Sequence, residues 1–522
     1  MTQADMTLSL ASVLAEPARR HPSRTAVVEG DQHVTYAELW QQVREHAAVL
    51  RERGVEAGDR VALVAPNVID FVRSYYAVQT LGAVVVPVPL LLVPDEAAHL
   101  IHDSGAKLVV GHTSQLELAR GCAQRTGVPL ITVGESAGEE PSLTALATSA
   151  EPLSTFVTRG AADPAVVFYT SGTTGPPKGA VLTQLNLVMN ATVNAFDAND
   201  TRPEDRVLGC LPLFHVFGQT VSLNTTFRAS ATLVLQPRFD PGEALDLVRE
   251  HEITQINGVP TMYIRMLEAA PAGIDLPSLR LCVSGGAAMP VAVLERFNER
   301  FGAQILEGYG LSETSPTATV NQPVHGVRPG TVGHPLWGID VEVADADHDD
   351  RVELLPVGET GEVVVRGHNV FAGYLGNPEA TATALVDGWF RTGDIGCKDS
   401  EGFLSIVDRK KDLIIRNGYN VYPREVEELL VRHPRVAQVA VIGVPDEHRG
   451  EEICAVVVPE AAEDRQVDDE LAEAIIGWTA ERTARHKYPR RVVFVDELPL
   501  GPSHKVLKRE LRDRVAQSSP NR

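Results

Sequence analysis

The sequence lacks any pattern typical of a structural metal site. Its five cysteines, at positions 122, 210, 282, 397 and 454, show no C-x-x-C spacing, and its sixteen histidines form no H-E-x-x-H run. We therefore expect no structural metal centre. An odd, scattered set of cysteines in a long chain instead indicates buried, reduced thiols in a reducing compartment.

Long hydrophobic runs are also missing. The longest apolar run, from Leu81 to Val93, is interrupted by Gly82, Pro87 and Pro89 and is too short to span a bilayer. It predicts a buried strand followed by a turn. The chain does not begin with a basic stretch followed by an apolar core, so we expect no signal peptide, no transmembrane segment and a cytoplasmic protein.

Positive charge is scarce over the chain as a whole. A formal charge of −22 over 522 residues argues against nucleic-acid binding, and the length predicts two or more domains. One exception is the stretch from Arg482 to Arg514, which has ten Lys or Arg residues against four acids. Such a stretch is typical either of a solvated basic face or of a docking surface for a multiply phosphorylated ligand.

The first part of the chain alternates helical and strand patterns. This alternation predicts an α/β fold with parallel sheets covered by helices. The predicted helices are 36–53 and 68–81, and the predicted strands are 60–65, 83–87, 107–111, 165–169, 232–235 and 279–283.

A different texture begins after Gly333. Short β-branched segments at 341–343, 361–367 and 402–407 predict antiparallel strands of a barrel or a twisted sheet. After residue 408 the pattern is that of a small α+β unit, with predicted helices at 423–433 and 468–485 and predicted strands at 436–444 and 453–459. We therefore expect an N-terminal domain of residues 1–408 and a C-terminal domain of residues 409–522.

A glycine-rich and hydroxyl-rich segment runs from Tyr169 to Gly179, with the sequence YTSGTTGPPKG. Glycines let backbone amides approach an oxyanion, hydroxyls donate to its oxygens, and Lys178 adds a positive charge. The segment does not match the Walker pattern, because Gly172 and Gly175 are three residues apart and Gly179 follows the lysine. Its composition favours a site for a nucleotide triphosphate.

Four further segments accompany it, at 307–314, 388–395, 408–423 and 503–511. In this order the five segments resemble those of the adenylate-forming enzymes, which include acyl-CoA synthetases, luciferases and peptide-synthetase adenylation domains. Within this superfamily the chain is most similar to medium- and long-chain fatty acid–CoA ligases. The resemblance implies a large N-terminal α/β domain with a small β-barrel-like subdomain, and a small, mobile α+β C-terminal domain. It also implies two half-reactions: a carboxylate attacks the α-phosphate of ATP to give acyl-AMP and pyrophosphate, and a thiol then takes the acyl group.

The resemblance assigns residues to ATP and Mg²⁺. Glu313 and Thr170 would hold Mg²⁺, because carboxylate and hydroxyl oxygens suit a hard cation that bridges phosphates. Asp394 and Arg409 would bind the ribose. The remaining nucleotide-binding residues implied are Ser171, Gly172, Thr173, Thr174 and Lys178 for the phosphates, and Gly308, Tyr309, Gly310 and Ser312 around the adenine, on which Tyr309 would stack.

Three positions in the C-terminal part match functional residues of the family. Lys505 corresponds to the catalytic lysine, whose charge would bring the attacking carboxylate and the α-phosphate together. Lys411 corresponds to the hinge between the domains, and Gly418 to a glycine beside the tunnel for the pantetheine arm of coenzyme A. The chain departs from the family pattern at His504, where glycine is usual, and at Gln184, where histidine is common.

The acid site is assigned by the same resemblance to His215, Gly285, Gly286 and Ala287, with His215 also expected to act in catalysis. Apart from His215 and Glu313, the segments 213–220, 284–290 and 308–320 carry no ionisable side chain of Asp, Glu, Lys, Arg or His type. A dicarboxylic acid would therefore bury a second carboxylate without a cation. We expect a medium- or long-chain fatty acid as substrate, with an aromatic acid of the 4-coumarate type as the alternative.

The acceptor and assembly remain open at this point. Coenzyme A is expected as the thiol, and the basic tail fits it, but an acidic carrier protein would fit the same tail. A luciferase-like oxygenase and a catalytically inactive nucleotide sensor are further alternatives, and retention of Lys505, Glu313 and Asp394 argues against the sensor. The resemblance is compatible with a homodimer.

Overall fold

The computed structural model describes residues 6–135, 139–170, 176–417, 419–446, 448–460, 469–499 and 506–517. It divides into two compact units, one of residues Met1–Val341 and Val364–Arg391 and the other of Glu342–Val363 and Thr392–Arg522. Three strands, at residues 339–344, 360–367 and 389–398, each have residues in both units. The domain boundary expected at residue 409 stays a prediction.

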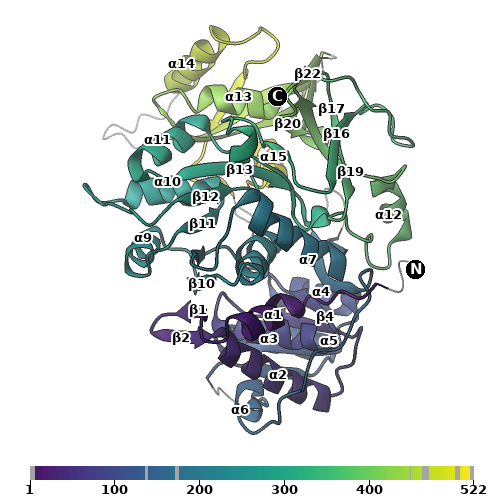
Figure 1. Ribbon diagram of the computed structural model, residues 1–522. Helices are drawn as coiled ribbons and strands as arrows, with labels where there is room; N and C mark the ends of the chain where they lie inside the picture. The colour runs from purple at the N-terminus through teal and green to yellow at the C-terminus, as the bar shows by residue number, and fades with distance from the viewer. Residues whose placement is uncertain are drawn as a thin grey trace. The chain divides into compact units, whose positions relative to one another are not determined.

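The first unit is built on two sheets (Figure 1). The larger one has nine strands in the order β15-β14-β13-β12-β11-β9-β10-β1-β2. Pairing is parallel from β1 through β10, β9, β11 and β12 to β13, whereas β2, β14 and β15 are antiparallel. The strands are β1 (Thr25–Glu29), β2 (Gln32–Thr35), β9 (Arg206–Gly209), β10 (Thr232–Leu235), β11 (Gln255–Gly258), β12 (Leu281–Ser284), β13 (Gln304–Gly310), β14 (Thr317–Val320) and β15 (His334–Pro335).

The second sheet has six strands in the order β6-β5-β3-β4-β7-β8. They are β3 (Arg60–Val64), β4 (Val84–Pro87), β5 (Leu108–His112), β6 (Leu130–Val133), β7 (Pro164–Thr170) and β8 (Lys178–Thr183). All pairs are parallel except β7–β8, which is an antiparallel hairpin at the edge. The predicted strands up to residue 283 are thus confirmed, within one or two residues.

Helices cover these sheets, as the alternating pattern predicts. Helices α9, α10 and α11 pack against β11, β12 and β13 in a core that includes Tyr263, Phe297 and Cys282 (Figure 1). Several helices begin with proline, which suits the first turn because its missing N–H would be unpaired there. The helices of this unit are α1 (Ser12–Arg20), α2 (Tyr36–Glu52), α3 (Ile69–Thr80), α4 (Pro94–Ser104), α5 (Leu116–Thr126), α6 (Leu143–Ala147), α7 (Gln184–Val193), α8 (Thr225–Arg228), α9 (Pro241–Glu250), α10 (Pro260–Ala269), α11 (Val291–Phe301) and α12 (Pro378–Ala384).

A third sheet contains the strands along which the two units divide. Its order is β16-β17-β19-β18, with β20 paired to β19. The strands are β16 (Ile339–Ala344), β17 (Thr360–Gly367), β18 (Leu385–Val386), β19 (Trp389–Lys398) and β20 (Leu404–Arg409). They agree with the short-strand pattern predicted for this part of the chain.

The second unit has its own sheet, in the order β22-β21-β24-β23 with β25 paired to β24. Alternate residues of β23 and β24 face opposite layers: Val441 and Val457 pack toward α13 and α14, and Ile442 and Val456 toward α15. The elements are β21 (Ile414–Arg416), β22 (Tyr419–Val421), α13 (Pro423–Leu430), β23 (Val436–Asp446), β24 (Gly450–Pro459), α14 (Asp469–Ala480), β25 (Arg491–Phe494) and α15 (Lys508–Gln517).

Two expectations need correction. The helix expected to reach Arg485 ends at Ala480, where Arg482 folds back over the Trp478 ring and donates to the Trp478 carbonyl at 2.9 Å. Of the five cysteines, all of which are unpaired thiols, Cys397 is only half-buried. In the part of the chain that the structure describes, no helix is long and apolar enough to cross a membrane, and no group of three or more His, Cys, Asp or Glu is arranged to hold a metal ion.

Candidate active site

The glycine-rich segment connects the two strands of the β7–β8 hairpin. Thr170, the last residue of β7, pairs with Lys178, the first residue of β8. The hairpin thus brings both ends of the segment together at the edge of the sheet. Of the predicted phosphate-binding residues, Ser171, Gly172, Thr173 and Thr174 lie outside the described residues.

Glu313 lies next to this hairpin. It belongs to a short 3₁₀ turn, η5 (Ser312–Thr314), which follows β13, and the residue is only 8% exposed. Its Oε1 accepts hydrogen bonds from the Thr170 hydroxyl at 3.3 Å and from the Tyr374 hydroxyl at 2.9 Å. The structure therefore brings together Thr170 and Glu313, the two residues predicted to share a cation, although 143 positions separate them.

Tyr374 is the residue that sequence reasoning missed. Its segment runs alongside β8, bound through three backbone hydrogen bonds: Val181 N to Gly373 O (3.0 Å), Ala372 N to Val181 O (2.9 Å) and Leu375 N to Gly179 O (2.8 Å). The Lys178 ammonium lies 5.2 Å from the centroid of the Tyr374 ring. Burial, together with the charge of Glu313, holds the pKa of the Tyr374 hydroxyl far above its usual range, so this hydroxyl is a donor at any physiological pH.

The end of β13 packs tightly on the strand beside it. A Cβ at Gly310 would overlap the Pro316 carbonyl oxygen, and one at Gly308 would lie 3.2 Å from the Thr319 carbonyl oxygen. Packing therefore requires glycine at position 310 and leaves little room for a side chain at position 308. Tyr309 between them and Ser312 in the next turn are half-buried.

The residues predicted to bind the acid come from three elements. His215 precedes a π-helical turn, η4 (Phe217–Asn224), and its Nδ1 accepts from the Phe217 N–H at 3.3 Å. A Cβ at Gly285, which directly follows β12, would lie 3.2 Å from the Phe217 ring and 3.6 Å from the Gly308 carbonyl oxygen. Gly285, Phe217 and Gly308 are therefore neighbours.

The next two predicted residues of this loop, Gly286 and Ala287, are exposed. Gly286 has a φ of +80°, a conformation that favours glycine.

Asp394 and Arg409 form a pair in the second unit. They lie opposite each other on β19 and β20, and Arg409 Nε is 3.3 Å from Asp394 Oδ1. The Asp394 side chain is 7% exposed, whereas that of Arg409 is 43% exposed. The pair thus presents a guanidinium at the surface, oriented by a nearly buried carboxylate.

Lys411 is exposed and lies in a 3₁₀ turn, η7 (Lys410–Asp412), that follows β20. Gly418 and Lys505 lie outside the described residues, so their assigned roles stay predictions.

Comparison with known proteins identifies the arrangement. Residues 14–375 match the family model described as AMP-binding enzyme, and residues 425–505 match the AMP-binding enzyme C-terminal domain. The chain belongs to the AMP-binding enzyme family. This confirms the resemblance inferred from the five segments.

Several AMP-binding enzymes are similar over almost the whole chain. A feruloyl-CoA synthase from Amycolatopsis sp is 39% identical over 503 residues, which cover 95% of this chain and 97% of that protein. A long-chain-fatty-acid–CoA ligase from Bacillus subtilis (strain 168) is 34% identical over 542 residues, covering 98% and 95%. The crystal structure of ATP-bound MatB from Rhodopseudomonas palustris has a TM-score of 0.89 at 34% identity and covers 97% of this chain and 98% of that one.

The residues around Glu313 would fit a magnesium ion. Both hydrogen bonds to the Glu313 carboxylate fall on Oε1, and Oε2 accepts none from the described residues. A carboxylate oxygen and a threonine hydroxyl are donors that suit Mg²⁺, which binds through one or two protein oxygens plus phosphates and water.

Gln184, at which this chain departs from the family pattern, has a structural role. Gln184 is buried, its Oε1 accepts from the Leu10 N–H at 2.7 Å, and its Nε2 donates to the Pro164 carbonyl at 3.4 Å. The side chain therefore ties the N-terminal segment to the start of β7. The other departure, His504, lies outside the described residues.

Much of the basic tail is paired within the second unit. Lys487 binds Glu425 at 2.7 Å, Lys508 binds Glu427 at 2.8 Å, and Arg512 binds Asp412 at 2.9 Å. These contacts neutralise part of the local positive excess. The basic face of this tail is accordingly less charged than the composition indicates.

Proposed function

We propose that this protein activates a hydrophobic monocarboxylic acid, and a medium- or long-chain fatty acid in particular, as its CoA thioester. As a member of its family, the protein is an ATP-dependent acid–CoA ligase that works through an acyl-AMP. The proposed part is the acid and the role of each residue. The observation that carries it is the cluster of Thr170, Glu313 and Lys178 at the hairpin, combined with acid-site segments that carry no ionisable side chain of Asp, Glu, Lys, Arg or His type apart from His215 and Glu313.

In the first half-reaction, Lys178 and the amides and hydroxyls of the hairpin loop would hold the β- and γ-phosphates. Glu313 and Thr170 would hold Mg²⁺, which offsets the charge that develops on phosphate oxygens. Lys505 would place the carboxylate of the acid against the α-phosphate, two anions that otherwise repel each other.

In the second unit, Asp394 would accept hydrogen bonds from the ribose hydroxyls and Arg409 would donate to the ribose. Their ion pair supports this role, because it orients both side chains before the nucleotide arrives.

The electrostatics of the acid site favour an acid without a second charge. Apart from His215 and Glu313, the segments 213–220, 284–290 and 308–320 carry no ionisable side chain of Asp, Glu, Lys, Arg or His type. A second carboxylate on the substrate would therefore be buried against these segments without a matching cation, at a cost of roughly several kcal/mol. Each methylene buried instead adds about 0.8 kcal/mol to binding, so affinity is expected to rise with chain length until the pocket ends.

An aromatic acid of the 4-coumarate type is a second candidate, for two reasons. The chain is 39% identical to a feruloyl-CoA synthase and 34% identical to a long-chain-fatty-acid–CoA ligase. In addition, the Phe217 ring lies next to Gly285, one of the residues assigned to the acid site, and aromatic rings pack favourably against each other.

The experiment is a comparison of kcat/KM for acetate, malonate, octanoate, palmitate and 4-coumarate, with ATP, Mg²⁺ and CoA. We expect a maximum at octanoate or palmitate and little turnover of malonate. A maximum at 4-coumarate would favour the aromatic candidate, and a maximum at acetate or malonate would contradict both. Pyrophosphate release that proceeds with these acids but yields no acyl-CoA would indicate a carrier-protein thiol as the acceptor.

A further inference from the structure

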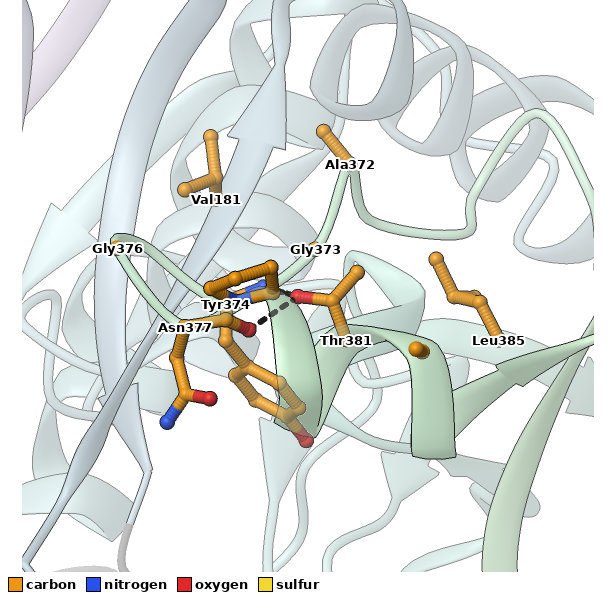
Figure 2. Close-up of a pocket in the computed structure, with 10 residues that line it drawn as sticks. Val181, Ala372, Gly373, Tyr374, Gly376, Asn377, Thr381 and Leu385 are labelled. Carbon is orange, nitrogen blue, oxygen red and sulfur yellow. Dashed lines mark hydrogen bonds between the residues drawn. The ribbon is translucent and has the colours of Figure 1, made fainter.

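Tyr374 belongs to a segment of residues 372–377, called here the strap, that lies along β8 and leads into helix α12. The strap walls a hollow of about 510 Å³, which small side chains such as Val181, Ala372 and Thr381 line (Figure 2). The strap is fixed on both of its sides, and each side contributes to the position of Tyr374.

On one side the strap adds to the edge of the sheet. Ala180 and Tyr374 form an antiparallel bridge, and the three backbone hydrogen bonds to β8 flank it. Lys178 begins the same strand, so the backbones of Tyr374 and Lys178 are tied to one element.

On the other side the strap is held by Thr381. Its hydroxyl accepts from the Tyr374 N–H at 2.9 Å and donates to the Asn377 carbonyl at 2.8 Å, the two bonds drawn in Figure 2. A Cβ at Gly373 would lie 2.6 Å from the Thr381 methyl carbon, so Gly373 permits this close approach. Both contacts fix the backbone from which the Tyr374 ring extends.

We propose that Tyr374 is a positioning residue of the nucleotide site: its hydroxyl orients Glu313 for the magnesium–ATP complex, and the strap holds Tyr374 in place. This inference rests on the proposed function and extends it to a residue outside the five motif segments. By occupying Oε1 of the carboxylate, the Tyr374 and Thr170 hydroxyls leave Oε2 for the cation.

Removing the tyrosine hydroxyl should weaken the binding of ATP only when Mg²⁺ is present. A hydrogen bond to a buried carboxylate is one of the stronger kinds, and its loss lets the carboxylate rotate. We therefore expect Tyr374→Phe to weaken Mg²⁺–ATP binding about tenfold and to leave binding of ATP in EDTA unchanged. Acyl-AMP formation should slow, whereas the KM for the acid and thioester formation from supplied acyl-AMP should stay the same.

The test is calorimetric titration of full-length wild type and variants with ATP, with Mg²⁺ and with EDTA, together with both half-reactions. Thr381→Val, which keeps the shape and loses both hydrogen bonds, should give a smaller loss of the same kind. Thr383→Val is the matched control, because Thr383 lies on the same helix and only donates to the Glu379 carbonyl. It should behave as wild type.

A double variant decides whether Tyr374 acts through Glu313. If it does, Tyr374→Phe combined with Glu313→Gln should bind Mg²⁺–ATP no more weakly than Glu313→Gln alone. Full additivity of the two losses, or equal binding by Tyr374→Phe and wild type, would overturn the inference. Failure of the wild type to bind ATP or to release pyrophosphate would instead overturn the proposed function.

Discussion

At the scale of single residues, the candidate site shows how a buried carboxylate is kept oriented. Glu313 is nearly buried and takes two hydroxyl donors on one oxygen. A charge removed from water needs such partners, because an unpaired buried charge is costly. The motif that contains Glu313 is readable in the sequence, but its partner Tyr374 lies 61 positions away and only the fold brings the two together.

The first residue-scale prediction concerns Lys505. Lys505→Ala should abolish most acyl-AMP formation, because nothing else would offset the repulsion between the carboxylate and the α-phosphate. Thioester formation from supplied acyl-AMP and CoA should persist, since the family's C-terminal domain moves between the half-reactions. Single-turnover assays of each half-reaction measure this, and equal loss of both would refute the assignment.

A second residue-scale prediction concerns His46 and pH. This buried side chain hydrogen-bonds the Gln42 carbonyl through Nδ1 at 2.8 Å, and burial lowers its pKa to about 4. The unfolded state has the ordinary pKa near 6.5 and therefore binds the proton more readily. The stability associated with neutral His46 is complete above pH 6.5 and is lost as the pH falls toward 4, by about 2 kcal/mol at pH 5.

The measurement is urea unfolding of wild type and His46→Leu at pH 7.5 and pH 5. The variant lacks this titration and should lose less stability than wild type between the two pH values. Identical losses in the two proteins would contradict a neutral, buried His46, because the charged groups beside it, Arg73 and Asp70, are common to both.

At the scale of elements, local patterns predicted most helices and strands, but not their partners. The helix at 36–53 and the strand at 60–65 appear as α2 and β3, because their apolar spacing and caps are local properties. The strap along β8 could not be predicted in this way. It joins residues nearly 200 positions apart through backbone hydrogen bonds, which carry no sequence signature.

The element-scale prediction concerns the turn η7. If Lys411 is the pivot of the C-terminal domain, its backbone dihedral angles must change between two poses. Lys411→Pro would fix φ, so adenylation should survive while thioester formation falls sharply. The two half-reactions, measured separately with Lys410→Ala as the neighbouring control, test this. Equal impairment of both steps, or of neither, would rule out the pivot.

At the scale of the whole molecule, the order of five segments predicted the family before any fold was known. Each segment supplies a different part of one reaction, so their joint occurrence in the right order is far more specific than any one of them. The identity of the acid is less accessible. It depends on the shape of an apolar pocket, and apolar side chains such as Phe217 contribute through packing, which leaves no motif.

The most direct test of the central claim is the identity of the products formed from ATP, octanoate and CoA by the full-length enzyme with Mg²⁺. We expect equal amounts of AMP, pyrophosphate and octanoyl-CoA, with no product when the acid is omitted. Formation of ADP and phosphate, or of AMP without dependence on any acid, would contradict it.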